Sequence, residues 1–378
     1  MRVMHVVEAM DRGGAETLVI EHVRHAGPGV QTSVVALNRG GAALDAAAAA
    51  GARTCSLGKH GGLGGFGAIR ALASRMREEG VTLVNGHNPT GALYATLAAS
   101  LAGVPVVRTE HSLHYSGRHS AFYPMLEPLL TRRCARVICV CDAVRASHAS
   151  RFPDLAARFV TVANGISDAP VSSREAARAA LGMDPAERVA LAVGSLTPQK
   201  AQLDLIEAFA GLAATHPSAR LWIAGEGRLR GALEQRIAAH ALGSRVTLLG
   251  ARDDVARLMA AADLFVLSSV REGLSVTLLE AMRAGRPAVA TRIGGNAEAV
   301  EDGVTGTIVP VGDPAALAAG LGALLGDPAR AAAAGEAARR RFEQRFRAER
   351  MVRETEAIYA TLTAARRRPV ARAGAQSA

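Results

Sequence analysis

The sequence SSVREGLSVTLLEAMRAGRPAVATRIGGNAE, residues 268–298, contains the clearest local structural signals of the chain. An apolar run ends at its start, and Glu272-Gly273 predicts a turn. Ser275 is expected to cap a helix that runs to residue 284, because Gly285 is typical of a helix C-terminus and a proline follows two residues later. The segment therefore predicts a strand, a turn and a helix, which is the repeating unit of an α/β fold.

The start of this helix predicts a site for a diphosphate. A helix N-terminus offers unpaired backbone N–H groups and the positive end of the helix dipole. Glu272 precedes the helix, and Glu280 lies in its second turn. Carboxylates accept hydrogen bonds from hydroxyl groups, so two of them beside a phosphate site suit the hydroxyls of a ribose and of a sugar. The residues alone leave open that Glu272 lies in a surface turn and Glu280 on a solvated helix face.

Strand-length and helix-length segments alternate along most of the chain. Continuous Val- and Ile-rich runs with helical spacers are typical of a parallel sheet covered on both faces. We therefore predict an α/β protein with two doubly wound, Rossmann-like domains, whose ligands bind outside the carboxyl ends of the strands. The predicted strands are 2–8, 32–37, 53–57, 82–87, 104–110, 136–141 and 159–163, then 189–194, 220–225, 246–249, 264–268, 288–291 and 306–309. The helices predicted in the second half are 202–214, 229–241, 254–261, 276–284 and 314–325.

A turn signal and a polar segment divide the two series. Asn164-Gly165 closes the first series, and 168–173 is expected to be a linker. The segment 329–368 is arginine-rich and is expected to be helical. The predicted units are a first domain at 1–167, a second at 168–345, a C-terminal helix at 346–368 and a disordered tail at 369–378.

The composition agrees with two α/β domains. Of the 378 residues, 49% are hydrophobic and only 3% aromatic, so the chain has enough apolar material for two closely packed cores. The formal net charge is +10 at pH 7. This charge predicts either general solubility or attraction to phosphates or to an anionic membrane surface.

The cysteines form no zinc-site pattern. No second Cys or His pair at ligand spacing accompanies Cys139 and Cys141, so these two, Cys55 and Cys134 are expected to be core thiols. The first residues contain too short an apolar stretch for a signal peptide, and no run approaches the length of a membrane span. We therefore expect a cytoplasmic protein.

Residues 272–298 resemble the donor site of the family-4 glycosyltransferases of the GT-B fold. That family carries Glu, seven residues and a second Glu, followed by Gly-Gly-x-x-Glu. This chain has Glu272 and Glu280 at that spacing, followed by Gly294-Gly295 and then Glu298. The resemblance extends over nearly the whole chain. It implies two Rossmann-like domains facing a central cleft, with the C-terminal helix crossing back to the first domain.

The resemblance also implies roles for these residues. Glu280 would hold the ribose hydroxyls, and Glu272 would hold a hydroxyl of the donor sugar and take part in catalysis. Glu298 would be a further contact to the donor or the acceptor. The backbone expected to meet the phosphates is that of Gly273, Leu274, Ser275 and Val276.

A second similar motif is VGSLTPQK at 193–200. Relatives usually carry Gly-Arg-Leu and later Lys-Gly, with both basic residues on the diphosphate. Lys200 is present, whereas Ser195 stands in place of the arginine and Ala201 in place of the glycine. Loss of one of two charged contacts could cost on the order of 1.5–3 kcal/mol. Arg228 is a candidate to compensate for it.

The first half adds further matches. Gly13-Gly14 follows the first predicted strand in a Gly-Gly-x-Glu loop, and glycines let the backbone approach a phosphate or a sugar. His111 ends the fifth predicted strand, where relatives carry a histidine near the anomeric centre of the sugar. His87 ends the preceding strand and is a second candidate.

The implied activity is a retaining glycosyl transfer without a metal or another cofactor. A sugar would pass from a nucleotide diphosphate, most often UDP and next GDP, to a hydroxyl of a glycan, a lipid-linked acceptor or a small molecule. The catalytic residues would be His111, Glu272 and Lys200, and no nucleic-acid partner is expected. Two alternatives stay open: a nucleotide-sugar 2-epimerase of the same architecture, and a non-catalytic nucleotide-sugar-binding module.

The acceptor side carries weaker signals. The loops at 58–67 and 114–121 are expected to select the acceptor. Arg132, Arg133 and Arg136 follow an apolar stretch. They predict a peripheral contact with an anionic membrane surface at the inner face of the plasma membrane, a patch for an acidic acceptor, or a solvated basic edge.

Overall fold

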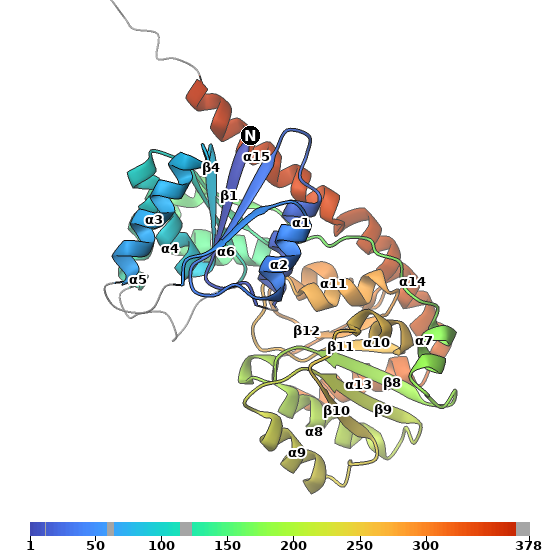
Figure 1. Ribbon diagram of the computed structural model, residues 1–378. Coiled ribbons are helices and arrows are strands. Elements are labelled where there is room, and N and C mark those ends of the chain that lie inside the picture. The colour runs from blue at the N-terminus through green and yellow to red at the C-terminus, as the bar shows by residue number, and fades with distance from the viewer. Residues whose placement is uncertain (12, 59–63, 114–122, 368–378) are drawn as a thin grey trace, which may run out of the picture.

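The computed structural model describes the chain except for residues 12, 59–63, 114–122 and 368–378. Figure 1 shows two α/β units connected by a pair of long C-terminal helices. The first sheet has seven strands in the order β3-β2-β1-β4-β5-β6-β7, and the second has six in the order β10-β9-β8-β11-β12-β13. All paired strands are parallel. The predicted fold class, two doubly wound Rossmann-like sheets, is confirmed.

The strand order sets where a ligand can bind. In each sheet the chain first winds to one side and then returns to the other, so the direction changes between β1 and β4 and between β8 and β11. Ligands of such sheets bind outside the carboxyl ends of the strands at this point. The strands of the first sheet are β1 (Arg2–Val7), β2 (Gln31–Ala36), β3 (Arg53–Ser56), β4 (Leu83–His87), β5 (Val106–Glu110), β6 (Arg136–Cys139) and β7 (Phe159–Thr161). Those of the second are β8 (Arg188–Val193), β9 (Ala219–Ala224), β10 (Val246–Gly250), β11 (Leu264–Leu267), β12 (Ala288–Thr291) and β13 (Gly306–Val309).

Helices cover both faces of each sheet. In the first unit α1 packs with α2 and α3 packs with α4, while in the second α8 packs with α13 and α11 packs with α14. The helices of the first unit are α1 (Gly14–Arg24), α2 (Ala42–Ala49), α3 (Gly64–Glu78), α4 (Asn88–Ala102), α5 (Tyr123–Arg133) and α6 (Asp142–Arg151), with a 3-10 helix η1 (Pro153–Arg158). They are followed by α7 (Arg174–Ala180), η2 (Pro198–Lys200), α8 (Gln202–Ala213), α9 (Arg230–Ala239), α10 (Val255–Ala261), α11 (Val276–Arg283), α12 (Asn296–Ala299), α13 (Pro314–Leu325), α14 (Pro328–Arg345) and α15 (Ala348–Arg367).

The sequence signals locate the elements well because the strands are buried on both faces. Every residue of β4 and of β11 is buried, as expected for strands covered by helices. Each predicted strand, and each helix predicted in the second half, agrees with the structure to within two residues at either end. The expected boundary at 167 and 168 lies between β7 and α7, and the expected tail at 369–378 lies outside the described residues.

The last helix returns to the first sheet. The helical segment is interrupted between α14 and α15. At this interruption Ile166 N donates to Phe346 O at 3.0 Å, and Ala348 N donates to Ile166 O at 3.0 Å. Farther along α15, the buried Tyr359 hydroxyl accepts a 2.7 Å hydrogen bond from Asn85 on β4. In Figure 1 this red helix runs beside α1. The two units are thus joined twice, by the segment after β7 and by α15.

Of the four cysteines, three are buried and Cys55 is partly exposed. Burial raises the pKa of the Cys141 thiol to about 12, so it is a protonated core group. In the part of the chain that the structure describes, no helix combines the length and the apolar character needed to cross a bilayer.

Candidate functional site

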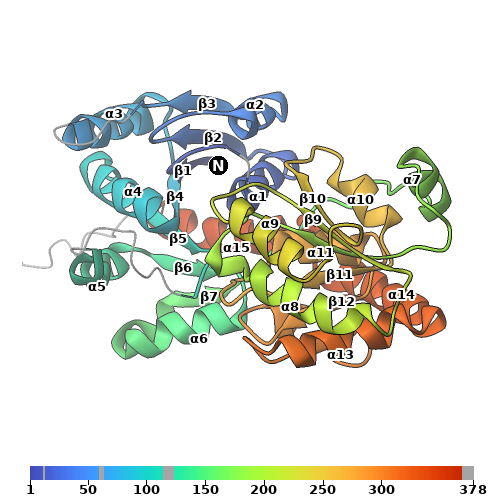
Figure 2. The ribbon, with the colours of Figure 1, turned by 90° about the horizontal axis from the view of Figure 1, so that it is seen from below.

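The carboxyl ends of the two sheets meet at the start of α11. The turn after β11 approaches the first unit so closely that a Cβ on Gly273 would overlap the carbonyl oxygen of His111. The next residue is also held from the first unit, because Asn164 Nδ2 donates to Leu274 O at 2.8 Å in a buried position. Figure 1 shows α11 between the first unit and the strands of the second sheet, and Figure 2 shows the strands of the first sheet in their order from β3 to β7. The predicted diphosphate site and the predicted sugar-contacting histidine are therefore neighbours.

The glycine loop after β1 reaches the same place. A Cβ on Gly14 would lie 3.3 Å from Val276 Cγ2, at the first residue of α11. Gly13 is the residue that precedes α1, and a Cβ there would overlap the carboxylate of Glu16. Burial raises the pKa of that carboxyl group. The Gly14 position thus packs closely against the start of α11, whereas Gly13 faces the flexible Glu16 side chain of its own helix.

The first turn of α11 differs from the prediction in one detail. Ser275 occupies the capping position, but its side chain makes no capping hydrogen bond; its Oγ lies 3.0 Å from Thr277 Oγ1 instead. The expected cap is therefore wrong, because a second hydroxyl within the first turn competes for the serine. The predicted C-terminus is confirmed: Gly285 has a φ of +66°, and its N–H donates to Met282 O at 3.0 Å. The backbone N–H groups in the first turn of α11 donate no hydrogen bond to the Ser275 side chain.

Lys200 and Glu272 form an ion pair beside this turn. Lys200 Nζ lies 2.5 Å from Glu272 Oε1, and Ser269 Oγ donates to the same oxygen at 2.7 Å. The two side chains are 19% and 10% exposed, respectively. Two predicted donor-binding groups thus neutralise each other in the structure.

Glu280 lies in a different environment on α11. Burial raises the pKa of its carboxyl group, and the opposing effect of the Arg283 charge is smaller. Within the described residues its side chain has no hydrogen bond or ion pair. The side chain is only partly buried, and its carboxylate oxygens are not among the fully buried polar atoms of the described residues. A carboxylate in this position is suited to bind hydroxyl groups of a ligand.

The two glycines of the Gly-Gly-x-x-Glu motif support the turn before α11. Gly294 has a φ of +45°, and a Cβ there would overlap the carbonyl oxygen of Glu272. Gly295 N donates to Gly273 O at 2.5 Å. This close backbone contact requires glycine. The motif therefore fixes the position of Glu272 and Gly273.

Glu298, at the end of this motif, connects the two units. Its Oε2 accepts a 2.9 Å hydrogen bond from Asp142 N, and its Oε1 accepts one of 2.7 Å from Ala143 N. These are the first two residues of α6 in the first unit. A carboxylate at a helix N-terminus satisfies free N–H groups and the helix dipole. The residue that we expected near the donor or acceptor is thus an inter-unit contact in this structure.

The loops that carry Ser195 and Arg228 lie side by side. Leu196 N donates to Glu226 O at 2.9 Å, and Leu229 N donates to Leu196 O at 3.2 Å. Ser195 and Arg228 are both exposed. An arginine is therefore present in the loop next to the serine that replaces the family's arginine.

Four histidines form a row that leads to the site. His5 Nδ1 lies 2.9 Å from His87 Nε2, and His87 Nδ1 lies 3.1 Å from His111 Nε2. The ring of His22 stacks on His5, with 5.4 Å between the ring centroids. Burial lowers the pKa of His22 and of His111 to about 4, and it lowers those of His5 and His87 well below the ordinary value. All four are therefore neutral near pH 7.

Each neutral imidazole has one donor nitrogen and one acceptor nitrogen. Since His87 bonds through both nitrogens, the proton positions on His5, His87 and His111 are coupled. Sequence reasoning proposed His111 and His87 but missed His5 and His22. The available signal was the concentration of histidines in the first half of the chain.

Parts of the expected acceptor side lie outside the described residues. These are 59–63, within the loop at 58–67, and the whole of the loop at 114–121. Arg132 and Arg133 lie at the exposed end of α5, and Arg136 begins β6 and is also exposed.

Comparisons with known proteins agree with the geometry. Residues 12–169 match the family model described as Glycosyltransferase Family 4, and residues 173–341 match Glycosyl transferases group 1. The chain is 32% identical over 299 residues to the glycogen synthase of Mycobacterium tuberculosis, covering 76% of this chain and 70% of that protein. It is 34% identical over 178 residues to the N-acetyl-alpha-D-glucosaminyl L-malate synthase of Bacillus anthracis, a match that spans 47% of this chain and 46% of that relative.

A solved structure shares the whole architecture. It is that of the Anabaena protein Alr3699/HepE in complex with UDP-glucose, which superposes with a TM-score of 0.84 at 23% identity over 96% of this chain and 100% of that one. The chain therefore belongs to the family-4, or group 1, glycosyltransferases of the GT-B fold and is a glycosyltransferase that uses nucleotide sugars.

Proposed function

We propose that this enzyme transfers a sugar from a UDP-sugar, or next from a GDP-sugar, to a hydroxyl of a glycan, a lipid-linked acceptor or a small molecule, with retention of the α configuration. The observation that carries the proposal is the start of α11, where backbone N–H groups without a partner among the described residues lie beside His111, and where Lys200 and Glu272 are paired. The Anabaena protein's complex with UDP-glucose supports UDP as the donor base.

In this proposal the pyrophosphate binds at the N-terminus of α11. The backbone of Gly273, Leu274, Ser275 and Val276 faces it, with the helix dipole favouring the negative charge. Glu280 binds the ribose hydroxyls through its partly exposed carboxylate, which has no hydrogen-bond partner among the described residues.

Donor binding exchanges the partners of one ion pair. Lys200 Nζ moves from Glu272 to the pyrophosphate. Glu272 then accepts a hydrogen bond from a hydroxyl of the donor sugar, while Ser269 Oγ still donates to its Oε1. Arg228, in the adjacent loop, provides the second positive charge, which the arginine replaced by Ser195 would otherwise supply. The ion pair keeps both side chains ordered before the donor arrives, which limits the reorganisation needed at the time of reaction.

The reaction then exchanges one bond at the anomeric carbon. The bond from this carbon to the diphosphate oxygen breaks, and a bond to the acceptor oxygen forms on the same face of the sugar. The acceptor proton passes to an oxygen of the leaving diphosphate. Lys200 and the α11 N-terminus stabilise the charge that develops on the leaving group. The neutral His111 positions the sugar without repelling the positive charge that develops at the anomeric carbon.

The first test is a panel of nucleotide sugars measured by thermal stabilisation of the full chain, followed by calorimetric titration of the best donor. Binding of a ligand to the folded state raises the melting temperature. The variant Glu280→Ala should bind the donor about 10- to 100-fold more weakly, because hydrogen bonds to a charged group contribute about 1.5–3 kcal/mol. Glu336→Ala, at a 76% exposed position on α14, is the matched control and should bind normally.

Product analysis with the full chain distinguishes the transferase from an epimerase and from a binding module. Incubation with the donor alone, followed by product analysis, should show at most slow hydrolysis; an epimerised nucleotide sugar would identify the epimerase instead. Donor binding without turnover across a range of acceptors would identify a binding module. Donor affinity of Glu280→Ala equal to that of the control would remove α11 from the donor site.

We further propose a peripheral contact of α5 with an anionic membrane surface. Met125 and Leu129 on this helix are 75% and 54% exposed, and Arg132 and Arg133 lie at its exposed end. Apolar side chains next to arginines suit the inner face of the plasma membrane, which carries anionic lipids. Sedimentation with phosphatidylglycerol vesicles, but not with phosphatidylcholine vesicles, should be lost in Met125→Glu/Leu129→Glu. Equal sedimentation of this variant and the parent protein would refute the contact.

A further inference from the structure

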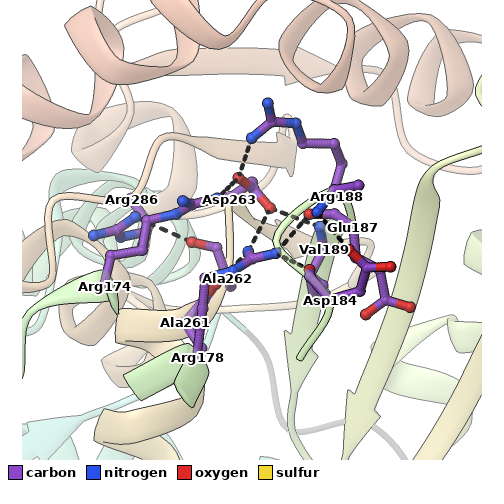
Figure 3. Close-up of polar contacts among 11 residues, drawn as sticks. Arg174, Arg178, Asp184, Glu187, Arg188, Val189, Ala261, Ala262, Asp263 and Arg286 are labelled. Atoms are coloured by element: carbon purple, nitrogen blue, oxygen red, sulfur yellow. Dashed lines mark hydrogen bonds and ion pairs between the residues drawn. The ribbon is translucent and has the colours of Figure 1, made fainter. Parts of the chain in front are cut away.

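A group of arginines lies at the edge of the second sheet that is opposite to the donor site (Figure 3). Asp263 immediately precedes β11, Arg188 is the first residue of β8, and Arg286 lies between α11 and β12. Arg174 and Arg178 lie on α7. These positions are at the amino ends of the strands, whereas the residues of the donor site follow the carboxyl ends. The group is therefore separate from the site described above.

One of these arginines has a structural role. Arg178 Nη1 donates to Ala261 O at 3.2 Å, and its Nη2 donates to Asp184 O at 3.0 Å and to Glu187 O at 2.7 Å. Nη1 also lies 3.4 Å from Asp263 Oδ2. These bonds use both terminal nitrogens and fix α7 to the sheet.

The other three arginines use few of their donors. Arg174 Nη2 and Arg188 Nη1 both contact Asp263 Oδ1, the second at 3.4 Å. Arg286 Nε and Nη1 donate to the carbonyl oxygens of Ala284 and Ala262, at 3.0 and 3.1 Å. A guanidinium group has five N–H donors. Within the described residues, most donors of Arg174 and Arg188, and Nη2 of Arg286, have no protein acceptor.

The local charge is not balanced by the protein. Four guanidinium groups face the carboxylates of Asp263 and Glu175, which leaves an excess of two positive charges. Glu187 does not reduce this excess, because it pairs with Arg220 at 3.0 Å. Burial and the nearby charge of Arg174 lower the pKa of Arg286. Like charges held this close gain stability from a bound anion.

The arginines line a pocket of about 230 Å³. Arg174, Arg188 and Arg286 form its polar part together with Asp263. The remaining wall is apolar and comes from the end of α13 and the start of α14, with Leu324, Leu325, Pro328 and Ala331. This volume is below the usual range for drug-sized ligands, about 300–1,000 Å³. The pocket thus combines a surplus of N–H donors with space for a short carbon skeleton.

We propose that this arginine pocket is a second binding site, for a small ligand that carries a phosphate or a carboxylate group and a short apolar part. Arg174 and Arg188 bind the anionic group through their unused N–H donors, and Arg286 adds a third positive charge. The leucine and proline side chains of α13 and α14 contact the carbon skeleton. The proposal does not depend on the identity of the donor sugar.

The test is a calorimetric titration of the full chain with inorganic phosphate, glycerol 3-phosphate and citrate at constant ionic strength, with the donor site saturated by the best nucleotide. Saturable binding is expected, and Arg174→Gln/Arg188→Gln should weaken it at least tenfold. Arg230→Gln, at an exposed ion-paired position on α9, is the matched control and should bind as the parent does. Phosphatidic acid vesicles, compared with soluble glycerol 3-phosphate, distinguish a lipid headgroup from a free metabolite.

Two results would overturn the proposal. One is the absence of saturable binding of all these anions to the parent protein. The other is equal binding by the double variant and the Arg230→Gln control. If the double variant does not fold, as judged by circular dichroism, Arg188→Gln alone replaces it, because Arg188 makes a single long side-chain contact. Crystals soaked in tungstate locate the anion directly, and tungsten at the start of α11 only, without any at the arginine pocket, would also refute the second site.

Discussion

The two sides of the proposed donor site are built from different kinds of groups. The side from the first unit is a row of four histidines, which burial keeps neutral. The side from the second unit carries charged groups, with Lys200 and Glu272 paired and Glu280 without a partner in the part of the chain that the structure describes. In the proposed complex, this difference suits the two parts of a nucleotide sugar. Its diphosphate needs positive charge, whereas its anomeric carbon gains positive charge and needs neutral neighbours.

Lowering the pH should destabilise the folded protein through the histidine row, and this is the largest expected effect. An unfolded histidine takes up a proton below about pH 6.5, while folded His22 and His111 do so only near pH 4. Their contribution to stability is complete above the unfolded pKa and is lost as the pH falls from about 6.5 to 4. Each buried histidine adds at most about 1.4 kcal/mol per pH unit to the slope of the free energy of unfolding.

Urea unfolding curves between pH 7 and 5 measure this slope. The variant His22→Phe keeps a ring on His5 but cannot titrate, so its slope should be smaller than that of the parent. His240→Phe, at a surface position beside Glu207, is the control. An unchanged slope in His22→Phe would mean that the pKa of His22 is the same in the folded and the unfolded chain, so that its burial does not keep it neutral.

The charged side is tested by removing the positive charge of Lys200. Lys200→Ala should lower turnover at saturating donor by roughly 10²- to 10³-fold, the usual effect of losing one preorganised group that stabilises a leaving charge. The same change leaves Glu272 without its ion pair. Lys200→Arg keeps a charge and should retain part of the activity. Turnover of Lys200→Ala equal to that of the parent would show that the α11 N-terminus suffices for the leaving group.

Glu298 joins the two sides, and its loss should have a smaller effect. Glu298→Ala removes both hydrogen bonds from the first turn of α6, a change that usually costs about 0.5–2 kcal/mol. We expect a lower melting temperature and a larger radius of gyration by small-angle scattering, since the two units lose a contact. Glu301→Ala, which removes an exposed ion pair with Arg341, is the control. The same radius for both variants would show that the remaining contacts, among them α15, the segment after β7 and the Asn164 hydrogen bond, hold the units together without Glu298.

Local signals predicted the fold because most of them act within a single element. The strands are buried on both faces, so their apolar runs are continuous, and Gly285 ends α11 where the sequence predicts. The histidine row could not be predicted in this way. Its members come from β1, α1 and the ends of β4 and β5, and only the strand order brings them together.

The details of hydrogen bonding were also beyond the sequence. A serine before a helix predicts a cap, but whether its hydroxyl meets the backbone or Thr277 depends on side-chain geometry. Glu298 matched a family motif, yet its partners lie about 150 residues away in the other unit. The arginine pocket has no local motif, because its residues come from α7, β8 and the loop before β12.

The smallest expected effect concerns the backbone of Ala201, the residue next to Lys200 on the charged side. It has a φ of +48° and a ψ of +41° directly after Lys200, where the family usually has glycine. A left-handed alanine costs about 1–2 kcal/mol, while glycine adds about 0.4–1 kcal/mol of flexibility to the unfolded chain. Ala201→Gly should therefore raise the free energy of unfolding by about 1 kcal/mol or less.

The control for this change is Ala214→Gly, at a right-handed position that ends α8. That variant gains only the flexibility of the unfolded chain, so it should be less stable than the parent, and urea unfolding measures both. Because the substitution at 201 leaves the Lys200 side chain in place, donor affinity should stay the same. If Ala201→Gly lost as much stability as the control, the left-handed alanine would carry no strain, and the preference of relatives for glycine would have to come from the space that the donor itself needs.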